Sequence, residues 1–307
     1  MRKVICVLLV IISIFSFAAC SRKSESLNAV KDFSVVDTLE QVNDEQLDVV
    51  LLFGQSNATG VASVEYLKND YPSNYELARL YVDKVMINYF VDNGANTSEG
   101  KFVSTALGQG ANQFYFGPEV GMAYWLQNSP RKTCILKYTW GGTILDSQWL
   151  DSNYKRGELY NAAMNFVSAS MDYLISKGYK ASIVAICWMQ GESDAYSDET
   201  TKRYYKNTDK FVSYLRKDLE NYSEEDFMFI DAGISDSIIW KNYKEVNKAK
   251  EDYASTHKNC YYFSTIDLGL TVDKEPVDSP DIAHYDSDSM FTLGQKFARY
   301  VYQPMVI

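Results

Sequence analysis

The feature that most constrains the fold is an alternation of two patterns that runs from Leu47 to the end of the chain. Short apolar runs bounded by Gly, Asn or Asp alternate with longer stretches whose apolar residues recur at helical spacing. Such alternation is typical of a parallel sheet covered by helices. It predicts strands at 49–53, 85–90, 133–138, 182–187 and 227–230, with 261–264 as a sixth candidate, and helices at 118–127, 158–176, 199–221, 242–256 and 289–302. We therefore expect a three-layer α/β/α sandwich around a central, mostly parallel sheet of five strands.

The N-terminus is typical of a targeting segment. Arg2 and Lys3 precede an apolar run over 4–17 that is too short for a comfortable membrane span. Small residues and then Cys20 follow, a pattern that resembles the lipobox of bacterial lipoproteins, in which the cysteine is acylated and becomes the first residue of the mature chain. An ordinary cleaved signal peptide with an incidental cysteine is the alternative.

This pattern divides the chain into three parts. We expect a lipoprotein signal peptide at 1–19, a lipidated N-terminus and polar tether at 20–46, and one folded domain at 47–307. A lipid on Cys20 would make the membrane a partner. The protein would then lie in the bacterial cell envelope, outside the cytoplasm.

Charge and cysteine usage exclude several classes of function. A formal net charge of −10 argues against nucleic acid as a partner, because binding phosphates requires clustered Lys and Arg. Cys134, Cys187 and Cys260 lie in apolar runs of the predicted domain, where we expect buried thiols and no essential disulfide. With only His257 and His284 and no Cys-x-x-Cys, the sequence predicts no metal site and indicates no cofactor.

Polar clusters fall where a parallel sheet binds its ligands, just beyond the carboxyl ends of strands. Three follow predicted strands, and a fourth lies between the last candidate strand and the last helix. They are 54–57 (Gly-Gln-Ser-Asn), 140–143 (Trp-Gly-Gly-Thr), 188–194 (Trp-Met-Gln-Gly-Glu-Ser-Asp) and 281–284 (Asp-Ile-Ala-His). Their positions predict one site assembled from loops far apart in the sequence.

Two of these clusters supply a nucleophile and a base. Ser56 stands at a strand-to-helix turn, where a nucleophilic serine is exposed and backbone amides can face an oxyanion, although a serine at such a turn is also a common helix N-cap. Asp281 and His284 are three residues apart, so the carboxylate can hold one ring nitrogen while the other faces Ser56. His257, at the polar end of a predicted helix, is the weaker candidate.

Taken together, the four clusters resemble the sialate O-acetylesterase and carbohydrate esterase family 6 branch of the SGNH hydrolases, which also includes acetylxylan esterases. The motifs occur in the family's order between about Val49 and Ala298 and include the sequence Gly-Pro-Glu at 117–119. The resemblance implies a flavodoxin-like sheet, hydrolysis of acetyl esters on carbohydrates through a Ser acyl-enzyme, and no metal.

By position, the resemblance makes Ser56 the nucleophile, His284 the base and Asp281 the residue that orients it. Oxyanion donors would be the backbone amides of Ser56 and of Gly141 or Gly142, with the side chain of Gln190 as the third. Glu192 would either orient His284 or hold the Ser56 loop, and we favour the second role. Further residues that could support the site or line the substrate pocket are Gln55, Asn57, Glu119 and Trp149.

Two other functions compete with the acetylesterase. An inactive glycan-binding lipoprotein would not need an intact catalytic set, and a lipase or thioesterase would be expected to have Asp where Gln55 stands. We also expect Trp140, Trp188 and Met189 to wall the acyl side tightly, which would favour acetyl over longer chains. The alternative is that they belong to strand ends and point into the core, which would leave the acyl side open.

Overall fold

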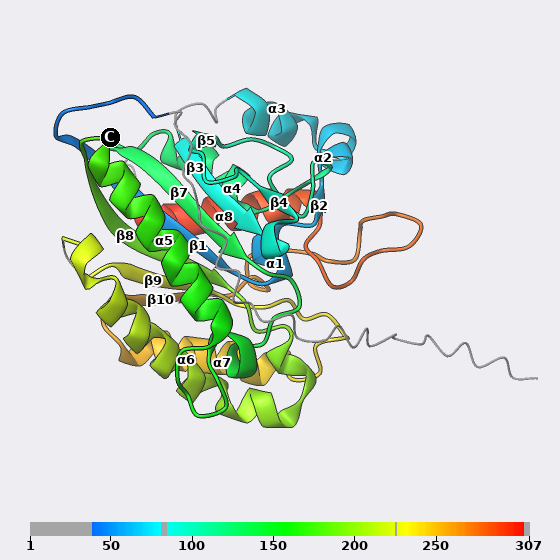
Figure 1. Cartoon of the computed structure of the whole chain (residues 1–307). Coiled ribbons are helices and arrows are strands. Elements are labelled where there is room, and N and C mark those ends of the chain that lie inside the picture. Colours follow the sequence, from blue (N-terminus) through cyan, green and yellow to red (C-terminus); the bar gives the residue numbers. More distant parts are fainter. Residues whose placement is uncertain (1–38, 81–84, 225, 304–307) are drawn as a thin grey trace, which may run out of the picture. The chain divides into compact units, whose positions relative to one another are not determined.

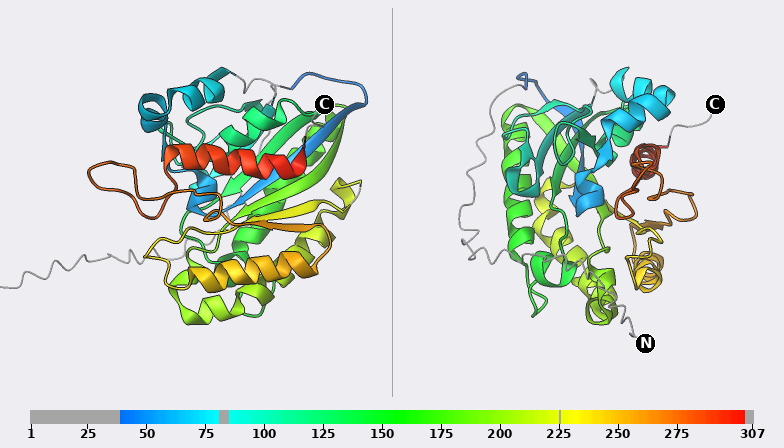
Figure 2. Two further views of the ribbon diagram at one scale, coloured as in Figure 1. Left: turned by 180° about the vertical axis from the view of Figure 1, so that it is seen from behind. Right: turned by 90° about the vertical axis from the view of Figure 1, so that its right-hand side faces the viewer.

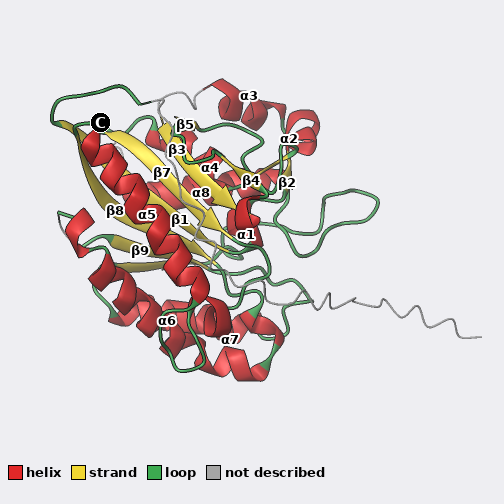
Figure 3. Ribbon diagram, in the orientation of Figure 1, coloured by secondary structure: helices red, strands yellow, loops and turns green. Residues whose placement is uncertain are grey.

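The computed structural model describes residues 39–80, 85–224 and 226–303, and these form a central sheet with helices on both faces (Figures 1 and 3). The strand order is β10-β9-β8-β1-β7-β3-β4, with β5 paired to β3. The six longer strands are parallel, and β4 and β5 are short antiparallel additions. Their bounds are β1 Glu45–Gly54, β3 Val85–Val91, β4 Asn96–Thr97, β5 Val103–Ser104, β7 Lys132–Thr139, β8 Tyr179–Met189, β9 Met228–Ala232 and β10 Cys260–Phe263.

The helices form the outer layers. α5 crosses one face of the sheet, while α4 and α8 pack together on the other (Figures 1 and 2). α6 and α7 pack against each other, and α7 also contacts β10. The bounds are α1 Ser56–Thr59, α2 Val64–Asp70, α3 Pro72–Leu80, α4 Pro118–Leu126, α5 Glu158–Ser176, α6 Asp198–Asp218, α7 Tyr243–Thr256 and α8 Ser287–Val301.

Strand β1 occupies the centre because it can be buried on both faces. Val49 to Phe53 are all fully buried, and such an unbroken apolar run is typical of a parallel strand between two helical layers. β1 pairs with β7 on one side and with β8 on the other, and Gly54 aligns with Thr139 and with Met189. The carboxyl ends of these three strands therefore meet at one edge of the sheet.

A small second sheet lies beside this edge. β2 (Ala62–Ser63) pairs antiparallel with β6 (Tyr115–Phe116). The chain after α1 is thereby joined to the chain before α4. Short helical turns complete the described chain: η2 Asp92–Gly94, η3 Leu145–Trp149, η4 Asp194–Tyr196 and η5 Glu220–Tyr222.

The α/β/α sandwich with a mostly parallel sheet is confirmed. The sheet is larger than the five strands predicted, because the candidate strand at the C-terminal side is present as β10 and two short strands add to the other edge. The predicted domain boundary at Leu47 would divide strand β1, which begins at Glu45. Leu39 is already buried in the core.

The predictions for the signal peptide and for Cys20 lie outside the described residues. None of the helices that the structure describes is long and apolar enough to cross a membrane.

Candidate active site

Ser56 is the first residue of α1, directly beyond the central strand. Gln55, and not Ser56, is the N-cap residue, so the serine hydroxyl is not used as a helix cap. Gly54 has φ +145°, and a Cβ at this position would lie 1.9 Å from the carbonyl oxygen of Met189. The amide of Gln55 donates to that same oxygen at 2.9 Å. Glycine therefore lets the chain turn tightly against β8 and present Ser56, which is half-buried.

His284 and Asp281 are hydrogen-bonded, with 2.7 Å between Nδ1 of the ring and Oδ2 of the carboxylate. The bond to His284 lowers the pKa of Asp281 below its usual value, so the carboxylate stays ionised at neutral pH. The amide of Ala283 donates to its other oxygen at 3.0 Å. The His284 side chain is 23% exposed and that of Asp281 46% exposed. With Nδ1 engaged, Nε2 is the ring nitrogen left to take a proton.

Asn57 connects the serine turn to the histidine loop. Its Nδ2 donates to Glu192 at 2.7 Å and to the carbonyl of Ala283 at 3.3 Å. Its Oδ1 accepts from the amide of Tyr285 at 3.1 Å. One fully buried side chain therefore holds the residues on both sides of His284.

Glu192 bonds to this connecting side chain and not to the histidine ring. It is fully buried and accepts from Asn57 through one oxygen, while the other oxygen has no hydrogen-bond partner among the described residues. Burial raises the pKa of Glu192. The structure thus shows the contact with the Ser56 loop that we favoured, and Asp281 is the carboxylate bonded to His284.

Ser56 and His284 line one cavity of about 660 Å³, which we call the Ser56 cavity. Its other described lining residues come from the segments after β1, β7 and β8, from the link between α1 and β2, from the start of α6 and from the loops before α7 and α8. They are Gln55, Val61, Gly141, Gly142, Ile144, Ser193, Tyr196, Ser197, Thr200, Trp240 and Ala283. His257 does not line it, since its ring stacks on Tyr253 at 4.0 Å on another part of the domain.

The oxyanion donors proposed from sequence have unequal access to this cavity. The amide of Gly141 donates to the carboxylate of Asp92 at 2.7 Å. Gly142 lines the cavity and has φ +69°, and a Cβ at this position would meet no other atom within 4 Å. The left-handed conformation makes glycine the favoured residue there.

Gln190 is fully buried and is not among the described residues that line the Ser56 cavity. Its Nε2 donates to Asp194 at 2.6 Å and to the carbonyl of Thr143 at 3.0 Å. Tyr204 donates to its Oε1 at 3.1 Å. In this arrangement Gln190 joins the loops after β7 and β8, and its role as an oxyanion donor stays a prediction.

Glu119 and Trp149 support the site from the core. Glu119 forms an ion pair of 2.7 Å with Lys137, and both side chains are fully buried. Trp149 is fully buried and donates through Nε1 to Thr143 at 3.2 Å. Neither is among the described residues that line the Ser56 cavity, so the sugar-pocket role considered for them is not the one this geometry favours.

The expected wall of the acyl side is wrong for two of its three residues. The third, Trp140, is half-buried and is not among the described residues that line the Ser56 cavity. Trp188 and Met189 are fully buried, and Trp188 packs edge-on against Trp149 with ring centroids 5.0 Å apart. Both belong to the hydrophobic core, where Trp188 also packs against Phe211 of α6 with ring centroids 4.5 Å apart. Tyr196 and Trp240, whose rings lie 5.1 Å apart, line the cavity instead.

Cys134, Cys187 and Cys260 are buried and unpaired. Among the described residues no cluster of His, Cys, Asp and Glu could hold a metal ion.

The comparison with known families bears directly on this geometry. The family described as carbohydrate esterase, sialic acid-specific acetylesterase, matches residues 46–303. The chain belongs to this family. It is an esterase of the carbohydrate acetylesterase type, as the four motifs predicted. No curated protein matches it significantly in sequence.

Three solved structures share the fold. A protein from Arabidopsis thaliana superposes with a TM-score of 0.61 at 18% identity, covering 83% of this chain and 97% of its own. NanS gives 0.58 at 12% identity, with 85% and 98% covered. XAC1771, a carbohydrate acetylesterase from Xanthomonas citri, gives 0.55 at 16% identity, with 83% and 56% covered. At these identities the likeness shows the fold alone.

Proposed function

We propose that this chain removes O-acetyl groups from carbohydrates through an acyl-enzyme on Ser56, with His284 as general base and Asp281 as the residue that orients it. The observation that carries the proposal is that Ser56 and His284 line the same cavity while Asp281 holds Nδ1 of the histidine. Nucleophile, base and orienting acid are the parts that a serine hydrolase requires.

The reaction would proceed in two halves. Ser56 Oγ attacks the acetyl carbonyl carbon as its proton moves to Nε2 of His284, and the tetrahedral intermediate then breaks the bond to the sugar oxygen. His284 gives the proton to that oxygen, and the deacetylated sugar leaves. A water molecule repeats the attack with His284 as base, which releases acetate and restores Ser56.

Backbone amides are the donors that we assign to the oxyanion. The amide of Ser56 begins α1, where the first N–H groups have no partner within the helix. The amide of Gly142 belongs to a residue that lines the cavity. Gly141 and Gln190 would contribute only after exchanging their present acceptors, Asp92 and Asp194.

Ser56→Ala and His284→Ala test the assignment. Each should remove nearly all hydrolysis of an aryl acetate while the circular dichroism spectrum and thermal unfolding stay those of the parent. A fluorophosphonate probe should label the parent and not the Ser56→Ala variant. Retention of a tenth or more of parental turnover by Ser56→Ala would refute the nucleophile.

We further propose that the mature protein begins at an acylated Cys20 and is held on the bacterial cell envelope, facing out of the cytoplasm. The support is the sequence alone: a basic start, an apolar run over 4–17 and small residues before the cysteine. Cys20→Ser should become soluble or remain unprocessed, because a single weak anchor or none does not retain a protein on membranes. Mass spectrometry of the mature N-terminus decides it, and an unmodified terminus at another residue would overturn the proposal.

A further inference from the structure

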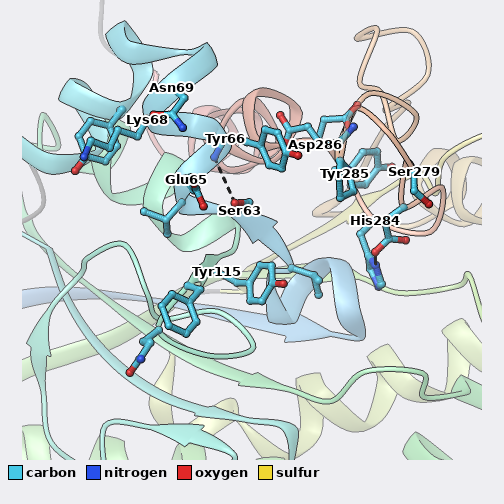
Figure 4. Close-up of a pocket in the computed structure, with 18 residues that line it drawn as sticks. Ser63, Glu65, Tyr66, Lys68, Asn69, Tyr115, Ser279, His284, Tyr285 and Asp286 are labelled. Carbon is cyan, nitrogen blue, oxygen red and sulfur yellow. Dashed lines mark hydrogen bonds and ion pairs between the residues drawn. The ribbon is translucent and has the colours of Figure 1, made fainter.

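A second, larger cavity lies on the other side of His284. We call it the outer cavity; its volume is about 850 Å³, and its lining includes Val61 and His284, which also line the Ser56 cavity. Figure 4 shows His284 at one end and Lys68 and Asn69 at the other. Both volumes fall in the range of about 300–1,000 Å³ that is usual for small-molecule sites. The two cavities are therefore adjoining spaces that meet at the proposed base.

One wall of the outer cavity is aromatic and is held by backbone hydrogen bonds. This wall consists of Phe114 and Tyr115 at β6, and Phe114 is 65% exposed. Tyr66 and Tyr75 line the cavity from α2 and α3. The amide of Val64 donates to the carbonyl of Phe114 at 3.0 Å.

The same wall is tied to the nucleophile turn. Strand β6 pairs with β2, and the amide of Ala111 donates to the carbonyl of Gly60, the C-cap of α1, at 2.8 Å. The backbone that carries Phe114 thus has a defined place relative to Ser56, which reduces the cost of ordering this surface when a ligand binds.

The charge of the outer cavity is negative. Glu65, Glu275, Asp281 and Asp286 line it, and Lys68 is the one lysine among the described lining residues, which include no arginine. Recognition of a carboxylate normally uses an arginine or paired cations. An acidic sugar would meet repulsion along most of this surface.

Two of these carboxylates are held by backbone amides. Asp286 is almost fully buried and its Oδ2 has no hydrogen-bond partner among the described residues, and the same is true of Oε1 of Glu275. The other oxygen of Asp286 accepts from the amide of Glu275 at 2.9 Å. The other oxygen of Glu275 accepts from the amide of Ser287 at 3.0 Å. Oδ2 of Asp286 and Oε1 of Glu275 are buried and do not face a ligand, so the aromatic wall is the surface suited to recognition, and it fits the apolar face of an uncharged sugar ring.

We propose that the outer cavity binds a second sugar ring, so that the preferred substrate is an O-acetylated oligosaccharide of uncharged sugars and not a free acidic sugar. This inference rests on the proposed function, since the acetylated ring must occupy the Ser56 cavity. The neighbouring ring of the same chain then reaches past His284 to the aromatic wall.

The test compares specificity constants, kcat/KM, for acetylated xylose and glucose, their acetylated disaccharides, 9-O-acetyl-N-acetylneuraminic acid and an aryl acetate. The parent should prefer a disaccharide to its monosaccharide and should hydrolyse the acidic sugar least. Phe114→Ala should reduce the preference for the disaccharide about twofold to tenfold, the value of one aromatic contact. Ile175→Ala is the control, because it removes an exposed apolar side chain from the end of α5, at the opposite ends of the strands.

Charge is tested separately with Glu65→Lys. Removing an exposed negative charge and adding a positive one should raise kcat/KM for the acidic sugar about 1.5-fold to fivefold relative to the neutral disaccharide. Increasing salt should reduce this gain.

Three results would overturn the inference: equal specificity constants for every disaccharide and its monosaccharide, an equal loss on all substrates in Phe114→Ala, or the acidic sugar as the best substrate. Failure of the proposed function looks different, because the parent would then hydrolyse neither the aryl acetate nor any acetylated sugar.

Discussion

Asp281→Asn and Glu192→Gln are a matched pair of substitutions that distinguish the two acids able to act on His284. Each keeps the shape of the side chain and replaces a carboxyl group with an amide. Asp281 bonds directly to Nδ1 of the ring at 2.7 Å, whereas Glu192 bonds to Asn57 and interacts with His284 only through its charge. The structure therefore predicts very different effects on turnover.

The magnitudes follow from the contacts. An Asn in place of the orienting Asp favours the wrong imidazole tautomer, which costs about 10⁴ in kcat where the acid is buried, as in chymotrypsin-like proteases. Asp281 is 46% exposed, so water shares in stabilising the ring, and we expect a loss of about 100-fold to 1,000-fold. Glu192→Gln keeps an oxygen that can accept from Asn57, so kcat should fall less than about tenfold.

Both variants should be assayed with an aryl acetate at saturating and limiting concentrations, after circular dichroism has shown them folded. KM should change little in Asp281→Asn, because the carboxylate acts on the base and not on the bound ester. If Glu192→Gln lost more turnover than Asp281→Asn, the orienting acid would be Glu192 and the interpretation of the site would be refuted.

Four further predictions follow from buried contacts. Gln190→Ala should lower the free energy of unfolding, measured in urea, by about 2–4 kcal/mol, because Asp194 loses a hydrogen-bond donor. If Gln190 is instead an oxyanion donor, the same variant should lose about 100-fold to 1,000-fold in kcat with a smaller loss of stability. Asn57→Ala should lower the free energy of unfolding by about 2–4 kcal/mol and also reduce kcat, because the loop that carries His284 loses its hydrogen bonds to Asn57. Glu119→Gln should cost about 3–5 kcal/mol by leaving Lys137 buried without its anion, measured again in urea. Burial raises the pKa of Asp194 to about 7, so the folded state binds more protons than the unfolded chain between about pH 4 and 7. The free energy of unfolding should therefore fall as pH rises through that window. Asp194→Asn should make this dependence on pH weaker.

Elements with clear boundary signals were predictable from sequence. The helix predicted at 158–176 is α5, which ends before Gly178 at φ +89°. Helices α2 and α3 were missed. They bury little, with Leu67 and Ala78 as their buried apolar residues in the described part, and Pro72 interrupts the periodicity between them. A weak apolar stripe gives a weak sequence signal.

The site was predictable to the extent that its residues follow strands. Ser56 and the pair Asp281 and His284 each stand in a recognisable local context. The fold brings Ser56 and His284 to one cavity, and Asp281 bonds to His284. Tyr196 and Trp240 were missed, because nothing local relates two aromatic residues more than forty positions apart. Tyr196 does follow the Gln-Gly-Glu-Ser-Asp motif within two residues, and that proximity was the one available signal.

The oxyanion hole shows where sequence patterns stop being sufficient. Gly141 and Gly142 are equivalent by motif, yet the structure separates them, because the Gly141 amide donates to Asp92 at 2.7 Å. Asp92 follows β3, two strands away from β1 across β7, and no pattern near it predicts a contact with the glycine turn. The bond to this carboxylate fixes the glycine turn beside Ser56. It also occupies the Gly141 amide, which then cannot donate to the oxyanion. We therefore infer that the hole relies on the amides of Ser56 and Gly142, and that Asp92 determines which of the two glycine amides faces the ester.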